Sequence, residues 1–208
     1  MSNIVHLQHP LLQHKLTDLR REAASTGRFR AVARQIAEML AYELCRELPT
    51  EPWRVQTPQG DTVGNKFSKP VLVVSILRAG ILMQEAFLDI IPGSVAGHLG
   101  IYRDSFVKAT VEYYNRLPNN ISEHHTFLVD PILASGATAI TAVNRLKDAG
   151  AKDLTFVCFL AAQPGLQNLA EVHPDIQIIT IGVDATLDAQ GMVLPGLGDV
   201  GERIYGVS

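Results

Sequence analysis

The second half of the chain contains short, continuous apolar runs, and these constrain the fold more than any other feature. Each run is four to eight residues long, most are rich in Val and Ile, and few alternate with polar residues. Uninterrupted apolar runs of this length are typical of strands buried on both faces, as in a parallel sheet. The five runs are Val71–Leu77, Val95–Tyr102, Thr126–Val129, Leu154–Ala161 and Ile176–Val183.

Helical patterns separate several of these runs. Ala79–Asp89, Thr138–Ala149 and Gly165–Val172 are the predicted helices, the second ended by a glycine and the third by a proline. Strands that alternate with helices predict an α/β fold, a parallel sheet flanked by helices. In such sheets ligands bind beyond the carboxyl ends of the strands, so the residues that follow each strand are the candidate site.

The first third of the chain has a different pattern. Apolar residues recur at helical spacing from Arg28 to Leu48, with Ser25 or Thr26 as candidate N-cap. Residues 49–60 then hold three prolines and a glycine, which predicts loops around one short hairpin. Because no linker is long enough to separate two domains, we predict a single domain over residues 1–208.

A candidate phosphate site follows the third apolar run. Asp130 ends the strand, and a small-residue turn with hydroxyl groups leads into a helix. The N–H groups and positive dipole end of a helix N-terminus bind phosphate monoesters, while Asp130 is placed to accept hydrogen bonds from sugar hydroxyls. A plain strand–helix turn capped by Ser135 or Thr138 is the alternative. A Walker loop is excluded, since no Lys follows the glycine.

Two arginines follow neighbouring strands in the sequence. Arg78 comes after the first run and before a glycine, and Arg103 comes after the second run. Guanidinium groups bind oxyanions bidentately, so two arginines near a phosphate turn suit a diphosphate. Internal ion pairs are the alternative, for Arg103 with the adjacent Asp104.

The segment from Asp184 to Arg203 is rich in glycine and ends the pattern of strands. Four glycines and a proline fall within about ten residues, which lets backbone approach a small or flat ligand closely. Backbone N–H and C=O groups in such a loop match the alternating donors and acceptors of a planar base such as uracil. A glycine-rich surface loop is the alternative.

Composition excludes several classes of partner. The net charge of −3 argues against a nucleic-acid or anionic-membrane surface, and the longest apolar run, about 71–83, is too short and carries Arg78. The first ten residues do not form a signal peptide. Cys45 and Cys158 lie far apart in apolar surroundings, which favours reduced thiols and a cytoplasmic protein.

Taken together, four separated motifs closely resemble those of the uracil phosphoribosyltransferase family. The resemblance runs nearly end to end in the family's order and spacing, and it includes an N-terminal arm with His9-Pro10-Leu11. The motifs are Ile76–Gly80, Tyr102–Asp104, Asp130–Gly136 and Pro195–Gly201.

This resemblance implies the type I phosphoribosyltransferase fold, with a core over about residues 70–183 and a hood from residues 1–69 and 184–208. It implies salvage of uracil, in which uracil and PRPP give UMP and diphosphate. The implied catalytic residues are Arg78, Arg103 and Asp199. The implied PRPP contacts are Arg78, Arg103, Asp130, Pro131, Ile132, Leu133, Ala134, Ser135, Gly136, Ala137, Thr138 and Asp199, and the implied uracil contacts are Val193, Gly198, Asp199 and Val200.

The resemblance also implies partners beyond the two substrates. Mg²⁺ is expected to arrive with PRPP and to be held mainly by substrate oxygens and water. Members of the family are commonly dimers or larger homo-oligomers, and some are activated by GTP. A segment over about residues 105–120 is expected to close over PRPP.

Two departures from the family pattern keep other functions open. Ala137 stands where a second glycine is usual, and Met192 stands where Tyr is usual beside the base. If Ala137 requires a positive φ, the cost is about 1 kcal/mol. The alternatives are a transferase with altered base preference and a non-catalytic nucleotide sensor or pyrimidine regulator on the same fold.

Overall fold

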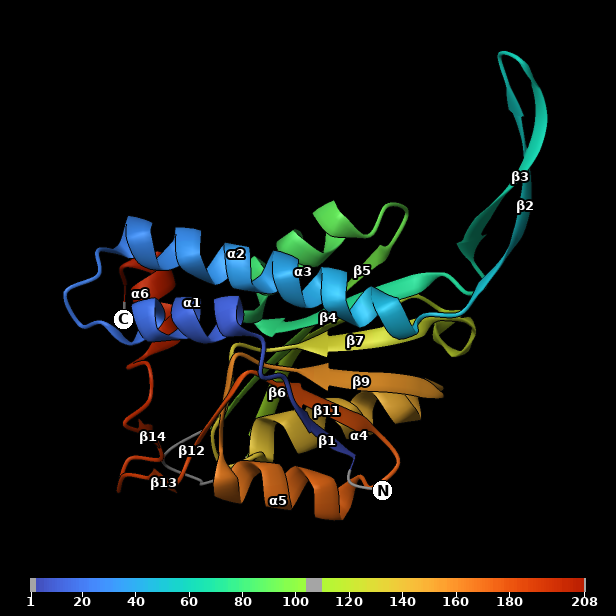
Figure 1. The fold of residues 1–208 in the computed structure, drawn as a ribbon. Helices are drawn as coiled ribbons and strands as arrows, with labels where there is room; N and C mark the ends of the chain where they lie inside the picture. Colours follow the sequence, from blue (N-terminus) through green and yellow to red (C-terminus); the bar gives the residue numbers. More distant parts are fainter. Residues whose placement is uncertain (1–2, 104–109, 208) are drawn as a thin grey trace.

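The computed structural model describes residues 3–103 and 110–207, and a mainly parallel sheet lies at its centre (Figure 1). Its seven strands lie in the order β1–β11–β9–β7–β4–β5–β6, and β6 pairs antiparallel with β5. The predicted parallel sheet is thus confirmed. The bounds are β1 Ile4–His6, β4 Val71–Leu77, β5 Val95–Arg103, β6 Thr110–Arg116, β7 His125–Val129, β9 Asp153–Val157 and β11 Gln177–Thr180.

Helices cover both faces of this sheet (Figure 1). One face carries α1 (Pro10–Arg20), α2 (Thr26–Leu44), α3 (Gly80–Ile90) and α6 (Val200–Tyr205), and the other carries α4 (Ala137–Asp148) and α5 (Gln163–Val172). No helix among the described residues has the combined length and apolarity needed to cross a bilayer.

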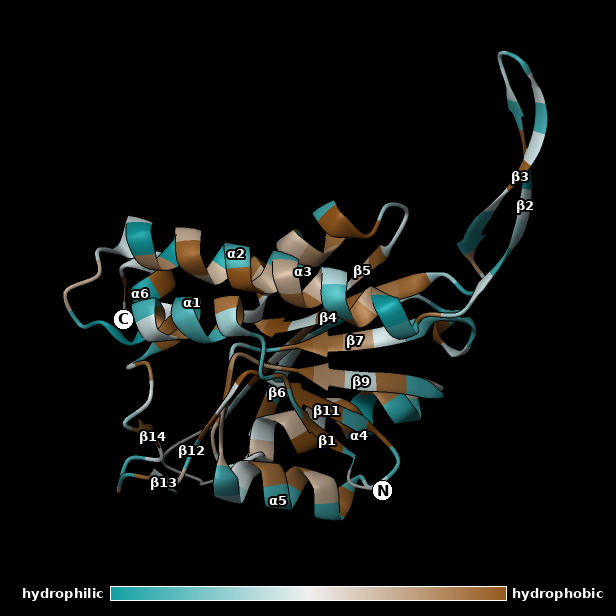
Figure 2. Cartoon of the chain, in the orientation of Figure 1, coloured by the Kyte–Doolittle hydropathy of each residue, from teal (hydrophilic) through white to brown (hydrophobic). Residues whose placement is uncertain are grey.

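The continuous apolar runs are explained by two separate hydrophobic cores. Along β4, Val71 and Val73 face the core under α2 and α3, whereas Leu72 and Val74 face the core under α4. The first six residues of the strand are therefore buried, and much of the central sheet is brown in Figure 2. An apolar run without alternation follows directly from cover on both faces.

The last two predicted strands each divide in the structure. Leu154–Ala161 spans β9 and part of β10 (Leu160–Ala162), and Ile176–Val183 spans β11 and part of β12 (Gly182–Asp184). The second members leave the main sheet and form a three-stranded sheet in the order β12–β10–β8, where β8 is Ile132–Leu133. Because both sheets are buried, the hydrophobic pattern does not show where the chain changes sheet.

Several elements were not predicted, and one of them corrects an expectation. Helix α1 and the edge strands β1 and β6 contain neither an apolar run as long as a strand nor a long stretch of helical periodicity. Residues 110–116 belong to the segment expected to close over PRPP, but they form β6, a regular strand of the main sheet. The other part of that segment, residues 104–109, lies outside the described residues.

The predicted short hairpin is instead a long arm. Strands β2 (Thr50–Thr57) and β3 (Gly60–Phe67) pair over eight residues and project away from the body (Figure 1). Trp53 and Val63 on this arm are exposed. The remaining elements are short: the 3₁₀ turns Cys45–Glu47 and Ile121–Glu123, and the pair β13 (Thr186–Leu187) and β14 (Val193–Leu194).

Candidate active site

A cavity of about 220 Å³ lies beyond the carboxyl ends of the central strands. Three segments far apart in the chain form its walls: the turn after β4, the turn after β7 and the C-terminal glycine-rich segment. The position is the one expected for a ligand of a parallel α/β sheet. The lining residues are Ala79, Asp130, Pro131, Ile132, Ala134, Gly191, Met192, Val193, Leu197, Gly198, Asp199, Val200 and Gly201.

The turn after β7 has the backbone geometry of an anion site. Gly136 is the N-cap of α4 with φ of 89°, and the first helical bond runs from the Ile140 N–H to the Gly136 carbonyl at 2.8 Å. The N–H groups of residues 137–139 therefore precede the helical ladder and lie at the positive end of the α4 dipole. Ser135 and Ala137 line a second hollow of about 340 Å³ beside this turn.

The concern about Ala137 is resolved by its position. Ala137 is the first residue of α4 and has helical backbone, and the left-handed residue of the turn is Gly136. The cost expected for a positive φ at Ala137 therefore does not arise.

Helix α5 packs against the turn after β7 and helps to fix its shape. A Cβ atom on Gly165, near the start of α5, would lie 2.0 Å from the Ala134 carbonyl oxygen. Asn168 of the same helix donates from Nδ2 to the Ser135 carbonyl at 3.0 Å. The turn is thus shaped by close backbone contact as well as by its own sequence.

Asp130 lies at the end of β7 and lines the cavity with its neighbours Pro131 and Ile132. Its backbone N–H donates to the Val157 carbonyl at 3.2 Å, which fixes the end of the strand. Burial of the carboxyl group raises its pKa to about 8, because the charged form loses solvation. In the free protein this acid is therefore a hydrogen-bond donor as well as an acceptor near neutral pH.

Arg78 lies directly after β4, as predicted, and its side chain is exposed. Among the described residues no carboxylate oxygen lies within ion-pair distance of its guanidinium, so for this part of the chain the internal ion-pair alternative is not supported. The Tyr205 hydroxyl of α6 donates to the Arg78 carbonyl at 2.9 Å.

Arg103 is the last residue of β5, the strand next to β4. The register pairs Leu77 with Gly100, so both arginines follow neighbouring parallel strands at the same edge of the sheet. The side chain of Arg103 lies outside the described part of the structure, and its role stays a prediction.

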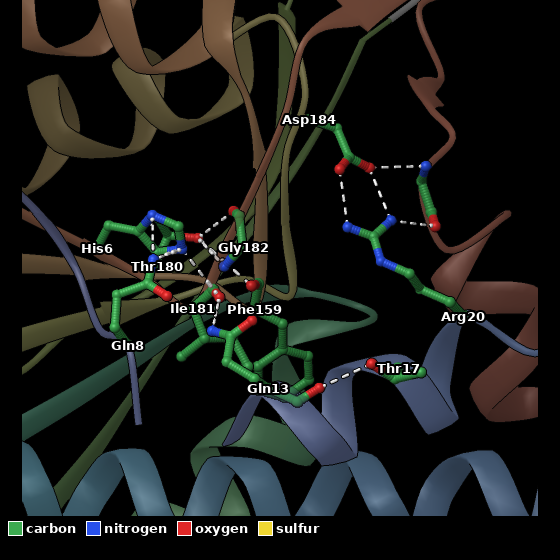
Figure 3. Close-up of polar contacts among 11 residues, drawn as sticks. His6, Gln8, Gln13, Thr17, Arg20, Phe159, Thr180, Ile181, Gly182 and Asp184 are labelled. Carbon is green, nitrogen blue, oxygen red and sulfur yellow. Dashed lines mark hydrogen bonds and ion pairs between the residues drawn. The ribbon is translucent and has the colours of Figure 1, made fainter. Parts of the chain in front are cut away.

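The C-terminal wall depends on an ion pair between the two ends of the chain. Arg20 of α1 donates from Nη2 to Asp184 Oδ1 at 2.7 Å and from Nη1 to Oδ2 at 2.8 Å (Figure 3). The Gly196 N–H donates to Asp184 Oδ2 at 2.8 Å, and the Gly196 carbonyl accepts from Arg20 at 3.0 Å. The hydrogen bonds from Arg20 lower the pKa of Asp184 and keep it ionised.

The predicted base contacts lie on this wall. Val193 is buried in β14, and Val200 begins α6 with its side chain buried. Gly198 has φ of 71°, a conformation that favours glycine. Asp199 is exposed and caps α6, where its Oδ1 accepts from the Glu202 N–H at 2.9 Å.

Sequence reasoning missed several residues that shape the site. Ala79, Leu197 and Gly201 line the cavity; each lies within a recognised motif but was not assigned a contact. Arg20 carried no signal, because its partner is 164 residues away. Of the predicted PRPP residues, Leu133 is buried in the core, whereas Gly136 and Thr138 lie in the turn and at the start of α4.

The chain is similar to known proteins over nearly its whole length. It is 46% identical over 201 residues to the uracil phosphoribosyltransferase of Streptococcus salivarius, covering 96% of both chains. A solved structure, the AQ2163 protein of Aquifex aeolicus, has a TM-score of 0.93 at 32% identity and 99% coverage of each chain. The adenine phosphoribosyl transferase of Trypanosoma brucei has a TM-score of 0.58 at 11% identity, covering 92% of this chain and 88% of that one, a likeness of fold alone.

A parallel sheet with this cavity at its carboxyl edge, together with that likeness of fold, defines a type I phosphoribosyltransferase fold. The sequence matches the profile of the uracil phosphoribosyltransferase family over residues 5–207. The chain belongs to the uracil phosphoribosyltransferase family.

Proposed function

We propose that this protein transfers the 5-phosphoribosyl group of PRPP to N1 of uracil, giving UMP and diphosphate. The observation that carries the proposal is a shared cavity. The turn after β7 and the C-terminal glycine-rich segment both line it, and its volume is about 220 Å³. A base in the cavity would then lie beside a ribose held at Asp130, with the phosphate directed towards the start of α4. Family membership supports the same reaction.

In this proposal PRPP lies along the carboxyl edge of the sheet. The 5-phosphate binds the N-terminus of α4, with contacts from residues 131–138, and Asp130 binds the ribose hydroxyls. Arg78 and Arg103 bind the diphosphate, which is supported by their places after neighbouring strands and by the exposure of Arg78.

The base binds against the C-terminal wall. The backbone at Val193 and Gly198 reads the edge of uracil, and Val200 packs against the ring. Rigidity of the wall supports this role, because a backbone that reads donors and acceptors must keep its position. The Arg20–Asp184–Gly196 network supplies that rigidity.

Catalysis rests on charge stabilisation and orientation. Loss of diphosphate from the anomeric carbon leaves oxocarbenium-like positive charge on the ribose, and Arg78 and Arg103 stabilise the negative charge on the leaving group. As the new C–N bond forms, uracil gives up its N1 proton. Burial keeps Asp130 protonated near neutral pH, so Asp199, the other carboxylate on the cavity wall, is the better acceptor.

Mg²⁺ fits the site as a companion of PRPP. Asp130 and Asp199 offer carboxyl oxygens, which Mg²⁺ prefers, but no group of three or more candidate ligands occurs among the described residues. A cation held mainly by PRPP oxygens and water suits this donor set. When bound, Mg²⁺ neutralises charge on the diphosphate.

The decisive experiment follows UMP formation from PRPP, Mg²⁺ and labelled uracil, with cytosine and hypoxanthine as parallel substrates. UMP from uracil alone is the expected result. Product from another base would assign an altered base preference, with Met192 on the cavity wall as the first residue to exchange. PRPP binding without product from any base would overturn the enzyme and favour a nucleotide sensor.

The two ends of the chain act as a hood over a core of about residues 70–183. Support comes from Arg203 of α6, which donates to the Leu19 and Leu197 carbonyls at 2.7 Å each and so joins the C-terminus to the end of α1. Strand β1 also belongs to the main sheet, so the N-terminal segment contributes to both parts.

We also propose that the protein is a homo-oligomer, a dimer or larger, that uses the β2–β3 arm. The arm leaves Trp53 and Val63 exposed by 53% and 61%, and a hollow of about 570 Å³ lies at its base. The register partners of Trp53 and Val63 are Gly64 and Arg54, so the two side chains point to opposite faces of the hairpin, and the arm offers apolar contact on both faces. The double variant Trp53→Ser, Val63→Thr is expected to lower the molar mass measured by light scattering. The control variant Tyr42→Ser, Val172→Thr, at two other exposed positions, is expected to leave it unchanged.

Two further properties rest on the family resemblance. GTP is a proposed activator, tested by adding it to the UMP assay at subsaturating PRPP. A cytoplasmic location agrees with two free cysteines, of which Cys158 is buried with its pKa raised to about 12.

A further inference from the structure

Helix α6 spans the distance between the two halves of the site. Its N-terminal residues Asp199 and Val200 line the base cavity. At its other end Tyr205 donates a hydrogen bond from its hydroxyl to the Arg78 carbonyl at 2.9 Å. The Arg78 guanidinium carbon lies 5.9 Å from the centroid of the Tyr205 ring. A single short helix therefore touches the base cavity and the turn that carries Arg78.

Several contacts hold helix α6 rigidly in place, so that it acts as a strut between its two ends. Arg203 in its middle donates to the carbonyls of Leu19, Leu197 and Arg21 at 2.7, 2.7 and 2.5 Å. The Arg203 guanidinium also lies over the Phe29 ring at 4.2 Å. Val200 and Ile204 are buried in the core that also contains Phe29. A displacement at the Asp199 end is therefore transmitted to Tyr205 instead of being absorbed within the helix.

Few hydrogen bonds join the Arg78 turn to the rest of the protein, and its other contacts are packing contacts of Ala79 with the core and of the buried Gly80 with β7. The Arg78 carbonyl also accepts from the Ile81 N–H at 3.2 Å, a contact inside the same turn. No side chain other than Tyr205 hydrogen-bonds to residues 78–80 within the described part of the chain. The Tyr205 hydroxyl thus fixes the backbone from which the Arg78 side chain extends.

We propose that Tyr205 is a positioning residue for Arg78, and that α6 couples occupancy of the base cavity to the binding of diphosphate. The proposal rests on the proposed function, since it assigns the diphosphate to Arg78. A base that orders the wall at Asp199 and Val200 orders the whole strut, and the Tyr205 hydroxyl then holds the Arg78 turn in its binding position. Preorganisation of this kind lowers the entropy lost on binding.

Tyr205→Phe is the test, because it removes the hydroxyl and keeps the ring. One hydrogen bond contributes on the order of a fivefold change in an equilibrium constant. We expect the KM for PRPP to rise about three- to tenfold. Because coupling between two ligands is reciprocal, the KM for uracil at saturating PRPP is expected to rise by a similar factor, with the Tm unchanged. Tyr42→Phe, at an exposed position on α2, is the matched control and is expected to leave all three unchanged.

A second measurement does not depend on turnover. Uracil and inorganic diphosphate together cannot react, so the dissociation constant of diphosphate is measured by calorimetry with and without saturating uracil. In the unmodified protein uracil is expected to tighten diphosphate binding several-fold, and in Tyr205→Phe this factor is expected to fall to about one.

The outcomes separate the two proposals. If the unmodified protein forms no UMP, the proposed function fails. If it forms UMP while Tyr205→Phe has the same KM for PRPP and the same coupling between uracil and diphosphate, the role of Tyr205 is overturned. A lowered Tm for Tyr205→Phe with an unchanged coupling factor would likewise reduce the contact to a structural one.

Discussion

The turn after β7 and the C-terminal wall of the cavity, which we propose to bind phosphate and base, are built in opposite ways. The turn from Asp130 to the start of α4 is one continuous segment whose shape comes from a strand end, a left-handed glycine and a helix start. The C-terminal wall is assembled from both ends of the chain through Arg20, Asp184 and Gly196. A turn made by one segment depends on few distant residues, here those of α5, whereas a wall made by distant partners fails when either partner is lost.

The largest effect on activity is expected at Asp130, the acidic residue of the turn after β7. Asp130→Asn is expected to lower kcat/KM by about 10²–10³, because an amide cannot reproduce both hydrogen bonds that we propose between the Asp130 carboxyl group and the ribose hydroxyls, in the transition state as in the ground state. The measurement is steady-state UMP formation at saturating Mg²⁺. A variant within about threefold of the unmodified protein would show that the ribose does not use this acid.

The same substitution is expected to stabilise the fold at alkaline pH. The pKa of Asp130 in the folded protein, about 8, lies above the ordinary 3.8. The contribution of this group to the free energy of unfolding is therefore fully present below about pH 4, where the carboxyl group is neutral in both states, and it is lost as the pH rises through 8. Each pKa unit corresponds to about 1.4 kcal/mol, and with partial exposure of the side chain we expect about 2 kcal/mol in favour of Asn at pH 8.5. Urea unfolding at pH 5 and 8.5 measures this; an equal difference at both pH values would contradict it.

The turn itself is tested through its support on α5. Gly165→Ala places a methyl 2.0 Å from the Ala134 carbonyl oxygen, so the helix or the turn must move. We expect a loss of about 3 kcal/mol in unfolding free energy and a raised KM for PRPP. Gly27→Ala is the control, since nothing lies within 4 Å of its added methyl. Equal stability of the two variants would show that α5 does not shape the turn.

The C-terminal wall of the cavity is tested by a substitution at Arg20, its ion-pair partner from the N-terminal part of the chain. Arg20→Met removes both ion-pair bonds to Asp184 and the bond to the Gly196 carbonyl, and we expect the KM for uracil to rise about tenfold with little change for PRPP. The neighbouring Arg21→Met is the matched control, because Arg21 is 70% exposed and pairs with Asp18 on the surface. A rise in the KM for PRPP instead of uracil would reverse the assignment of the two regions.

The sequence by itself determined the parallel sheet, the helices that follow its strands and the residue types placed at the strand ends. Apolar runs, a glycine before a helix and arginines after strands are local patterns, because burial on two faces and backbone geometry act on neighbouring residues. This is why β4, the turn after β7 and the position of Arg78 were predicted.

Only the tertiary structure decided how the ends of the chain complete the site. Arg20 with Asp184, and Tyr205 with the Arg78 carbonyl, join residues 164 and 127 positions apart, and no local pattern records such a partner. It also showed that Ala137 is helical and that one oxygen of Asp199 caps α6. Side-chain contacts across the fold depend on how the elements pack, and that packing is a property of the whole chain.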